Sequence, residues 1–129
     1  MSILKIYRGQ ALRQALKAIK QPVEVIYFAL EQPEPDTLAA LSELMALTKH
    51  LSVTTQAAEA NAPADRLVVR SHSGRELIFV GAPMGLELAA LVSAIIVSGR
   101  GDSGLLPETR QALAQLNTPL KLEIFTTPT

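Results

Sequence analysis

The sequence predicts an α/β fold in which a small mixed β-sheet carries helices on both faces. A nearly continuous apolar run over 23–30 is followed by a helical pattern over 37–49 and a weakly alternating run over 51–57. A polar turn then separates two further apolar runs, and the most apolar helix follows over 86–98. This order gives a parallel strand-helix-strand unit, an antiparallel hairpin and a final helix.

The first part of the chain reads as helix, strand and loop. Within 8–20 the apolar residues recur at helical spacing and basic residues occupy other faces, which predicts an amphipathic surface helix. Pro22 ends that helix and opens the strand over 23–30, whose apolar character is typical of a central strand. The segment 31–36 holds two prolines and is therefore a loop, with Asp36 as the N-cap of the next helix.

The middle of the chain reads as helix, strand and hairpin. The run 37–49 is rich in Ala and Leu and lacks Gly and Pro, so it predicts the clearest helix. The runs 67–70 and 76–80 flank a polar connection, 71–74, in which glycine supplies the positive φ of a tight turn. They are therefore expected to form an antiparallel hairpin.

A helix followed by a strand occurs twice in the chain. The first copy matches the second with one constant offset, pairing Arg13, Leu16, Pro22 and Phe28 with Arg110, Leu113, Pro119 and Phe125. An offset of roughly 100 residues is too long for a solenoid repeat and is the size of a small domain. The chain is therefore expected to hold one unit over 1–117 and the opening strand of a second over 118–129.

Composition limits the classes of function. The 129 residues are 48% hydrophobic, enough for one core, and 12 basic residues balance 12 acidic ones. No basic cluster is present, so nucleic acid is not an expected partner. The absence of cysteine excludes disulfides, thiolate metal sites and thiol catalysis within these residues. No signal peptide or membrane-length apolar run occurs, so a cytoplasmic location without membrane contact is expected.

Two stretches carry a resemblance to a known family. They are the 81–87 turn, which reads Gly-Ala-Pro-Met-Gly-Leu-Glu, and the 106–113 helix that leads to 124–129. Both resemble proteins with tandem thioredoxin folds: the N-terminal domain of the alkyl hydroperoxide reductase flavoprotein, and the protein disulfide oxidoreductases of thermophiles. The resemblance implies a thioredoxin-like (glutaredoxin-like) first fold. It also implies a second fold whose Cys-x-x-Cys pair begins just after a strand that ends like 125–129.

The resemblance also locates the active-site motif of the first fold, between its first strand and the following helix. Anchoring on Leu38 places the two cysteine positions at Gln32 and Pro35, neither of which performs thiol chemistry. The cis-proline of the fold would fall near Asp65 or Arg66, where this sequence has no proline. The chain therefore resembles the reductase flavoproteins, whose first fold lacks the motif, and no catalytic residue, cofactor or metal is expected.

Glu87 follows the turn formed by Gly81, Pro83 and Gly85, and the resemblance implies a role for it. Family members carry a glutamate here, near the dithiol of the second fold, where it accepts or holds a proton during thiolate formation. The residue taken alone has a structural explanation, since a carboxylate in the first helical turn is stabilised by about 0.3–1 kcal/mol. The proton-handling role predicts partial burial and an orientation toward 119–129.

The remaining chemical patterns favour structural explanations. Residues 99–104 match the G-x-G-x-x-G pattern of phosphate-binding loops, but they follow a helix and contain Asp102, which would repel a phosphate. A linker between helices is expected there instead. His50 and His72 lie in different elements, without the spacing of a metal site.

Two functions remain open at this point. The first is a redox-inactive half-domain that supports and orients a Cys-x-x-Cys-bearing second fold of the same chain in thiol-disulfide electron transfer to a peroxidase. The second is a free-standing, non-enzymatic module that binds a partner through a groove or a sheet edge. The 119–126 segment is too apolar to remain exposed, so it is expected to pair with the sheet edge or to form a homodimer.

Overall fold

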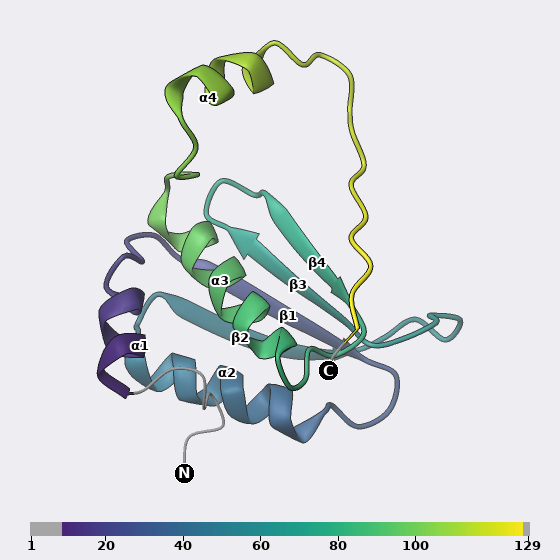
Figure 1. The fold of residues 1–129 in the computed structure, drawn as a ribbon. Coiled ribbons are helices and arrows are strands. Elements are labelled where there is room, and N and C mark those ends of the chain that lie inside the picture. The colour runs from purple at the N-terminus through teal and green to yellow at the C-terminus, as the bar shows by residue number, and fades with distance from the viewer. Residues whose placement is uncertain (1–8, 128–129) are drawn as a thin grey trace.

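The computed structural model describes residues 9–127, and its side chains from residue 11 onward (Figure 1). Arg8, the expected first residue of the first helix, lies outside the described residues, as do Pro128 and Thr129. The elements follow in the order α1 (Gly9–Leu16), β1 (Val23–Ala29), α2 (Pro35–Leu47), β2 (Leu51–Ala57), β3 (Arg66–Ser71), β4 (Glu76–Val80), α3 (Glu87–Arg100) and α4 (Pro107–Ala114). No helix within residues 9–127 is both long and apolar enough to cross a membrane.

The four strands form one mixed sheet in the order β2-β1-β3-β4. β1 runs parallel to β2, with Val23 opposite Leu51, and antiparallel to β3, with Val25 opposite Val69. β3 and β4 form the antiparallel hairpin. The predicted strand-helix-strand crossover and hairpin are therefore confirmed, and β1 is the central strand, hydrogen-bonded on both sides.

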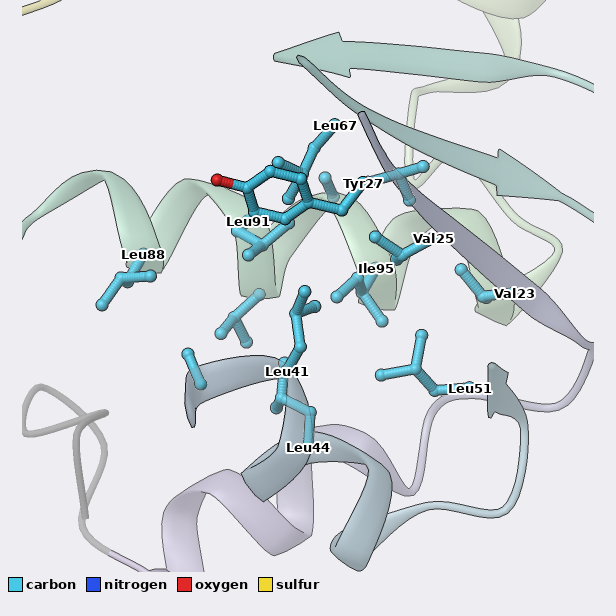
Figure 2. Packing of buried hydrophobic residues seen from close by; sticks show 14 of the residues in the cluster. Val23, Val25, Tyr27, Leu41, Leu44, Leu51, Leu67, Leu88, Leu91 and Ile95 are labelled. Atoms are coloured by element: carbon cyan, nitrogen blue, oxygen red, sulfur yellow. The ribbon is translucent and has the colours of Figure 1, made fainter. Parts of the chain in front are cut away.

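One face of the sheet carries α1, α2 and α3. Side chains of β1 alternate between the two faces, and Val23, Val25 and Tyr27 point toward these helices (Figure 2). They belong to one buried cluster with Leu12, Leu16, Ile19, Ala29, Ala40, Leu41, Leu44, Leu51, Leu67, Val69, Leu88, Leu91, Val92, Ala94 and Ile95. The core is therefore a single layer between this face and the three helices.

The opposite face of the sheet carries no helix among the described residues. Ile26 of β1 and Val68 of β3 are buried at its centre, whereas Ile78 and Val80 of the edge strand β4 are exposed. The expectation of helices on both faces is therefore met on one face only. The reason is that the connection 58–65 between β2 and β3 is interrupted by a proline and forms no helix.

The rim of this helix-free face is polar. The guanidinium of Arg70 lies 3.6 Å from the Glu24 carboxylate and 2.9 Å from that of Glu76, so one charge pairs with both neighbouring strands. The guanidinium of Arg66 lies 4.5 Å from the centre of the Phe28 ring, within cation-π distance. These cross-strand contacts make the face compatible with water without a covering helix.

α2 begins before the expected N-cap, Asp36. The N-cap is Glu34, in an extended conformation (φ −63°, ψ 120°), and Pro35 is the first helical residue. Proline suits this position because its fixed φ is helical and its missing N–H would have no intrahelical acceptor. Asp36 therefore lies within the first turn, where the helix dipole favours a negative charge.

The chain after α3 contributes nothing to the core. Every residue from 101 to 127 is exposed, and α4 has no buried residue. Residues 118–127, which we call the C-terminal arm, belong to no strand of the described sheet. Pairing with the sheet edge of the same chain, one of the two expectations for this segment, is therefore not observed.

α3 approaches the start of β1 closely at Gly99. The carbonyl oxygen of Gly99 accepts hydrogen bonds from the amides of Lys20 and Gln21, both at 2.9 Å. A Cβ atom at Gly99 would lie 2.6 Å from Cγ2 of Ile19 and 2.9 Å from Cγ2 of Val23. Glycine is therefore required here by the closeness of two buried side chains.

We expect Gly99→Ala to lower the free energy of unfolding by about 1–3 kcal/mol, because the added methyl group overpacks the junction of α3 and β1. The loss should appear although alanine favours a helix by about 1 kcal/mol over glycine. Urea unfolding measures it. Ser98→Ala, at the adjacent and partly exposed helical position, is the matched control and should change stability by less than about 0.5 kcal/mol. An unchanged midpoint for Gly99→Ala would contradict this account.

Candidate functional site

The candidate site lies at one end of the sheet, where several connections meet (Figure 1). β1 ends there and α2 begins, β3 begins after the 58–65 connection, and β4 ends before the 81–85 turn into α3. The active-site motif expected for this fold class would occupy the connection between β1 and α2. The structure places Gln32, exposed, in that connection and Pro35 at the first position of α2.

The hydroxyl group of Tyr27 organises this end of the sheet. It donates a hydrogen bond to Oδ2 of Asp65 at 2.6 Å and accepts one from the amide of Glu34 at 2.9 Å. The other carboxylate oxygen of Asp65 accepts a hydrogen bond from the amide of Leu30 at 3.0 Å. The end of β1, the connection that holds Gln32, and the start of β3 are therefore joined through one buried phenol.

Burial and the hydrogen bond to Asp65 raise the pKa of Tyr27 to about 12. The phenol is fully buried, so ionisation would place a negative charge in the core beside a carboxylate. The neutral hydroxyl group is therefore kept as a donor. Its contacts serve to position backbone segments, because both groups that it joins are held in fixed hydrogen bonds.

Asp65 stands close to where a thioredoxin-like active site would place its cis-proline. No peptide bond among residues 9–127 is cis. The carbonyl oxygen of Asp65 instead accepts a hydrogen bond from the amide of Gly81 at 2.6 Å, which ties the start of β3 to the end of β4. This corner of the fold is thus closed by hydrogen bonds where a cis-proline would otherwise shape the loop.

The turn after β4 is locked to α2. Gly81 and Gly85 both have positive φ, at 90° and 56°, which a residue with a side chain rarely adopts. Pro83 between them is buried, and its carbonyl oxygen accepts a hydrogen bond from Oγ1 of Thr37 at 2.7 Å. Thr37 is itself fully buried, so this bond fixes the turn against the first turn of α2.

Glu87 is the first residue of α3 and is partly buried. Its Oε1 accepts a hydrogen bond from Oγ1 of Thr126 at 3.0 Å. The carboxylate therefore points toward the C-terminal arm and holds its far end beside the 81–85 turn. Partial burial and an orientation toward the arm are the placement expected for Glu87 from the sequence, and its proton-handling role stays a prediction.

The segment expected as a linker begins inside α3, which ends at Arg100, and residues 101–106 form the ordered linker to α4. Oδ1 of Asp102 accepts hydrogen bonds from the amide of Gly104 and from the guanidinium of Arg110. These contacts, with the Gly104 amide first, lower the pKa of the Asp102 carboxyl group. Arg100 also donates to the carbonyl oxygens of Asp102 and Ser103. The amide of Gly104 is thus already bonded to a carboxylate, and the glycine pattern lies where α3 ends and the connection to α4 begins.

Within residues 9–127, no three His, Cys, Asp or Glu residues gather around a point where they could hold a metal ion. His50 lines a shallow cleft between α1 and the end of α2, and His72 lines another beside the β3-β4 turn. The two imidazoles therefore lie apart, in separate surroundings.

β1 and β2 are parallel and joined through α2, and β3 and β4 form an antiparallel hairpin that leads into α3. This sheet, with α2 and α3 packed on one face, defines a thioredoxin-like fold. The chain is similar to the alkylhydroperoxide reductase AhpF of Enterococcus faecalis, with TM-score 0.67 and 19% identity over 83% of this chain and 58% of that chain. It is also similar to the AhpF NTD_N/C domain of the same organism, with TM-score 0.64 and 18% identity over 79% and 56%.

The chain thus spans less than two thirds of each of these structures. At such identities the likeness establishes the fold, and it confirms the predicted thioredoxin-like class. No protein-family profile matches the sequence. No curated protein matches it either.

The sequence alone did not identify the residues whose hydrogen bonds join the connections at the candidate site. Tyr27, Thr37 and Asp65 come from separate elements, and the bond between Tyr27 and Asp65 joins residues 38 positions apart. One signal was available: a tyrosine within an otherwise aliphatic central strand needs a partner for its hydroxyl group. The identity of that partner depends on the folded connection.

Replacing Tyr27 with Phe is expected to cost about 1–2 kcal/mol of unfolding free energy, because Asp65 and the Glu34 amide both lose a partner. The folded state raises the pKa of this phenol from about 10 to about 12, so its contribution is complete below pH 10 and is lost between about pH 10 and 12. Urea unfolding measured from pH 7 to 12 tests this. Tyr27→Phe should lack that alkaline loss, and Asp65→Asn, which keeps an acceptor, should destabilise less at pH 7. Parallel pH curves for the wild type and Tyr27→Phe would contradict it.

Proposed function

We propose that this chain is a redox-inactive thioredoxin-like half-domain, located in the cytoplasm. In this proposal it supports and orients a second, Cys-x-x-Cys-bearing fold during thiol-disulfide electron transfer to a peroxidase. The similarity to AhpF domains supports a redox context. The degenerate positions Gln32 and Pro35, in a chain without cysteine, support the absence of redox chemistry in this half.

The observation that carries the proposal is a difference in burial between the two copies of the repeat. In the first copy, five apolar positions are at most 4% exposed: Leu16, Ile19, Val23, Val25 and Tyr27. The same offset gives five apolar residues in the second copy that are 49% to 87% exposed: Leu113, Leu116, Leu120, Leu122 and Ile124. The second copy therefore has the side chains of a helix and central strand without the sheet that would bury them.

This pattern supports a second fold that begins with α4. α4 occupies the place in the second copy that α1 has in the first, and it shares no buried residue with the core described above. The repeat thus starts one helix earlier than the strand at 118. The ordered linker at 101–106 then separates the two folds.

Glu87 is the side chain through which this half would act on the second fold. Its carboxylate already accepts a hydrogen bond from the C-terminal arm at Thr126, within the segment 125–129 after which the family pattern begins its Cys-x-x-Cys pair. We propose that Glu87 accepts or holds the proton released when the dithiol forms its thiolate.

A free-standing interaction module is the second candidate, and one observation favours it. β4 is the edge strand of the described sheet, with one side unpaired among residues 9–127, and its apolar residues Leu77, Ile78 and Val80 are 47%, 54% and 73% exposed. Such an edge accepts an added strand from a partner. The two candidates differ in whether activity depends on a covalently linked second fold.

Insulin reduction with dithiothreitol separates the candidates. The 129-residue chain is expected to match the protein-free blank, because it supplies no thiolate. Extended by a thioredoxin-like fold with Cys-x-x-Cys, the tandem should accelerate reduction. A shortened protein that keeps α4, the arm and the second fold but lacks residues 1–104 should have a lower Tm than the tandem and should reduce insulin more slowly. Turnover by the 129-residue chain would contradict redox inactivity, and equal Tm and rate with and without residues 1–104 would contradict the supporting role.

In the same tandem, Glu87→Gln is expected to slow disulfide exchange with a peroxidase at neutral pH by about tenfold or more, since the proton acceptor is removed. Glu87→Asp should retain part of the rate. Glu108→Gln, which removes a carboxylate from the first turn of α4, is the matched control and should have no effect. The measurement is the pH dependence of the exchange rate. A profile unchanged by Glu87→Gln would leave Glu87 as a helix-terminal charge.

A further inference from the structure

The C-terminal arm has the side-chain pattern of a strand that lacks a partner. Leu120, Leu122 and Ile124 alternate with Lys121 and Glu123, as on the two faces of a β-strand. The three apolar side chains are 68%, 87% and 87% exposed. The ammonium group of Lys121 pairs with the Glu123 carboxylate of the same chain at 2.9 Å, with both side chains largely in water.

We infer that the arm pairs with the arm of a second copy, as an antiparallel two-stranded ribbon centred on Leu122. In this register a two-fold axis passes between the two Leu122 residues, so the interface is the same on both copies. Leu120 then lies opposite the partner's Ile124. This inference concerns the 129-residue chain and does not depend on the redox role.

Charge complementarity selects this occupant and this register. Two-fold pairing about Leu122 sets Lys121 directly opposite the partner's Glu123, and Glu123 opposite the partner's Lys121. Opposite charges in directly facing positions stabilise a strand pair, and like charges destabilise it. The two ion pairs within the separate copies, one in each, are thus exchanged for two pairs between the chains.

The edge of β4 offers no such match. Apart from Glu76 at its start this strand carries only apolar side chains, so an arm laid along it could set at most one of Lys121 and Glu123 opposite a charge. The arm of the same chain pairs with no strand of the described sheet. The self-complementary register is therefore the one in which both charges of the arm face an opposite charge.

α4 supplies the cover that a two-stranded ribbon needs. An isolated ribbon is only marginally stable in water, so its apolar face must pack on another element. Leu113 in α4 and Leu116 just after it are 49% and 53% exposed. They match Leu16 and Ile19 of the first copy, which share a buried cluster with β1. One such helix from each copy would cover the ribbon in the same way.

The ribbon and a second thioredoxin-like fold use the same backbone groups of the arm. A fold that takes up the arm as its central strand therefore excludes the dimer. A monomeric 129-residue chain would overturn the ribbon and leave the redox proposal intact. If the 129-residue chain dimerises but the tandem lacks reductase activity, the redox proposal is overturned and the ribbon stands.

The test is a charge exchange within the arm of the 129-residue chain, with mass followed by analytical ultracentrifugation over a range of concentrations. The wild-type chain is expected to dimerise. Lys121→Glu and Glu123→Lys should each weaken the dimer by about tenfold or more, because each sets two pairs of like charges face to face. The double variant restores both pairs and should recover an affinity within a few-fold of the wild type. Lys49→Glu, which changes net charge away from the arm, is the control and should leave the dimer unchanged.

Three outcomes would overturn the inference. They are a wild-type chain that stays monomeric, a double variant that dimerises no better than the single variants, and a dimer that survives Lys121→Glu but is lost with Ile78→Lys in β4. The last would show that a second copy docks on the edge of β4. The exchanged residues lie outside the core, so circular dichroism should show the same fold for every arm variant.

Discussion

The rest of the structure depends on β1, which is hydrogen-bonded along both of its edges and buried beneath helices on one face of the sheet. β1 is hydrogen-bonded to β2 and β3, and its odd-numbered side chains meet α1, α2 and α3 in one cluster. Because the core is a single layer, each of these helices must reach the same strand. The close approach of α3 at Gly99 is a consequence, since a helix that buries Leu91 and Ile95 on β1 and β3 comes within contact distance of Val23 at its end.

The same strand sets the chemistry of the candidate site. Near its end β1 carries a buried tyrosine whose hydroxyl group needs partners, and the folded connections supply them as Asp65 and the Glu34 amide. This end of the sheet is where the fold class would place a reactive dithiol. Here it is joined by hydrogen bonds of the Tyr27 hydroxyl group and the Asp65 carboxylate instead. Together with the buried bond from Thr37 to Pro83, this makes the corner a rigid support. Rigidity at this point suits a half-domain that positions another fold.

Many of the exposed apolar side chains lie after α3. Apolar residues of α4 and the C-terminal arm are exposed, although their counterparts in α1 and β1 form the centre of the core. Apolar residues at matching positions are therefore buried in the first copy and exposed in the second. The difference is that only the first copy has a sheet to pair with. The bond between Thr126 and Glu87 holds this part of the arm beside the 81–85 turn. A second fold or a second copy is the partner that we propose for the arm.

The sequence by itself determined the element order, the parallel crossover and the hairpin, because periodicity, proline and glycine act within a few residues. Its prediction of a degenerate motif at Gln32 and Pro35 came through a resemblance rather than through local physics. Only the tertiary structure decided that all packed helices share one face, that α2 begins at Pro35, and that Tyr27, Thr37 and Asp65 close the candidate site. These features depend on side chains that are distant in the chain and meet only when the sheet has formed.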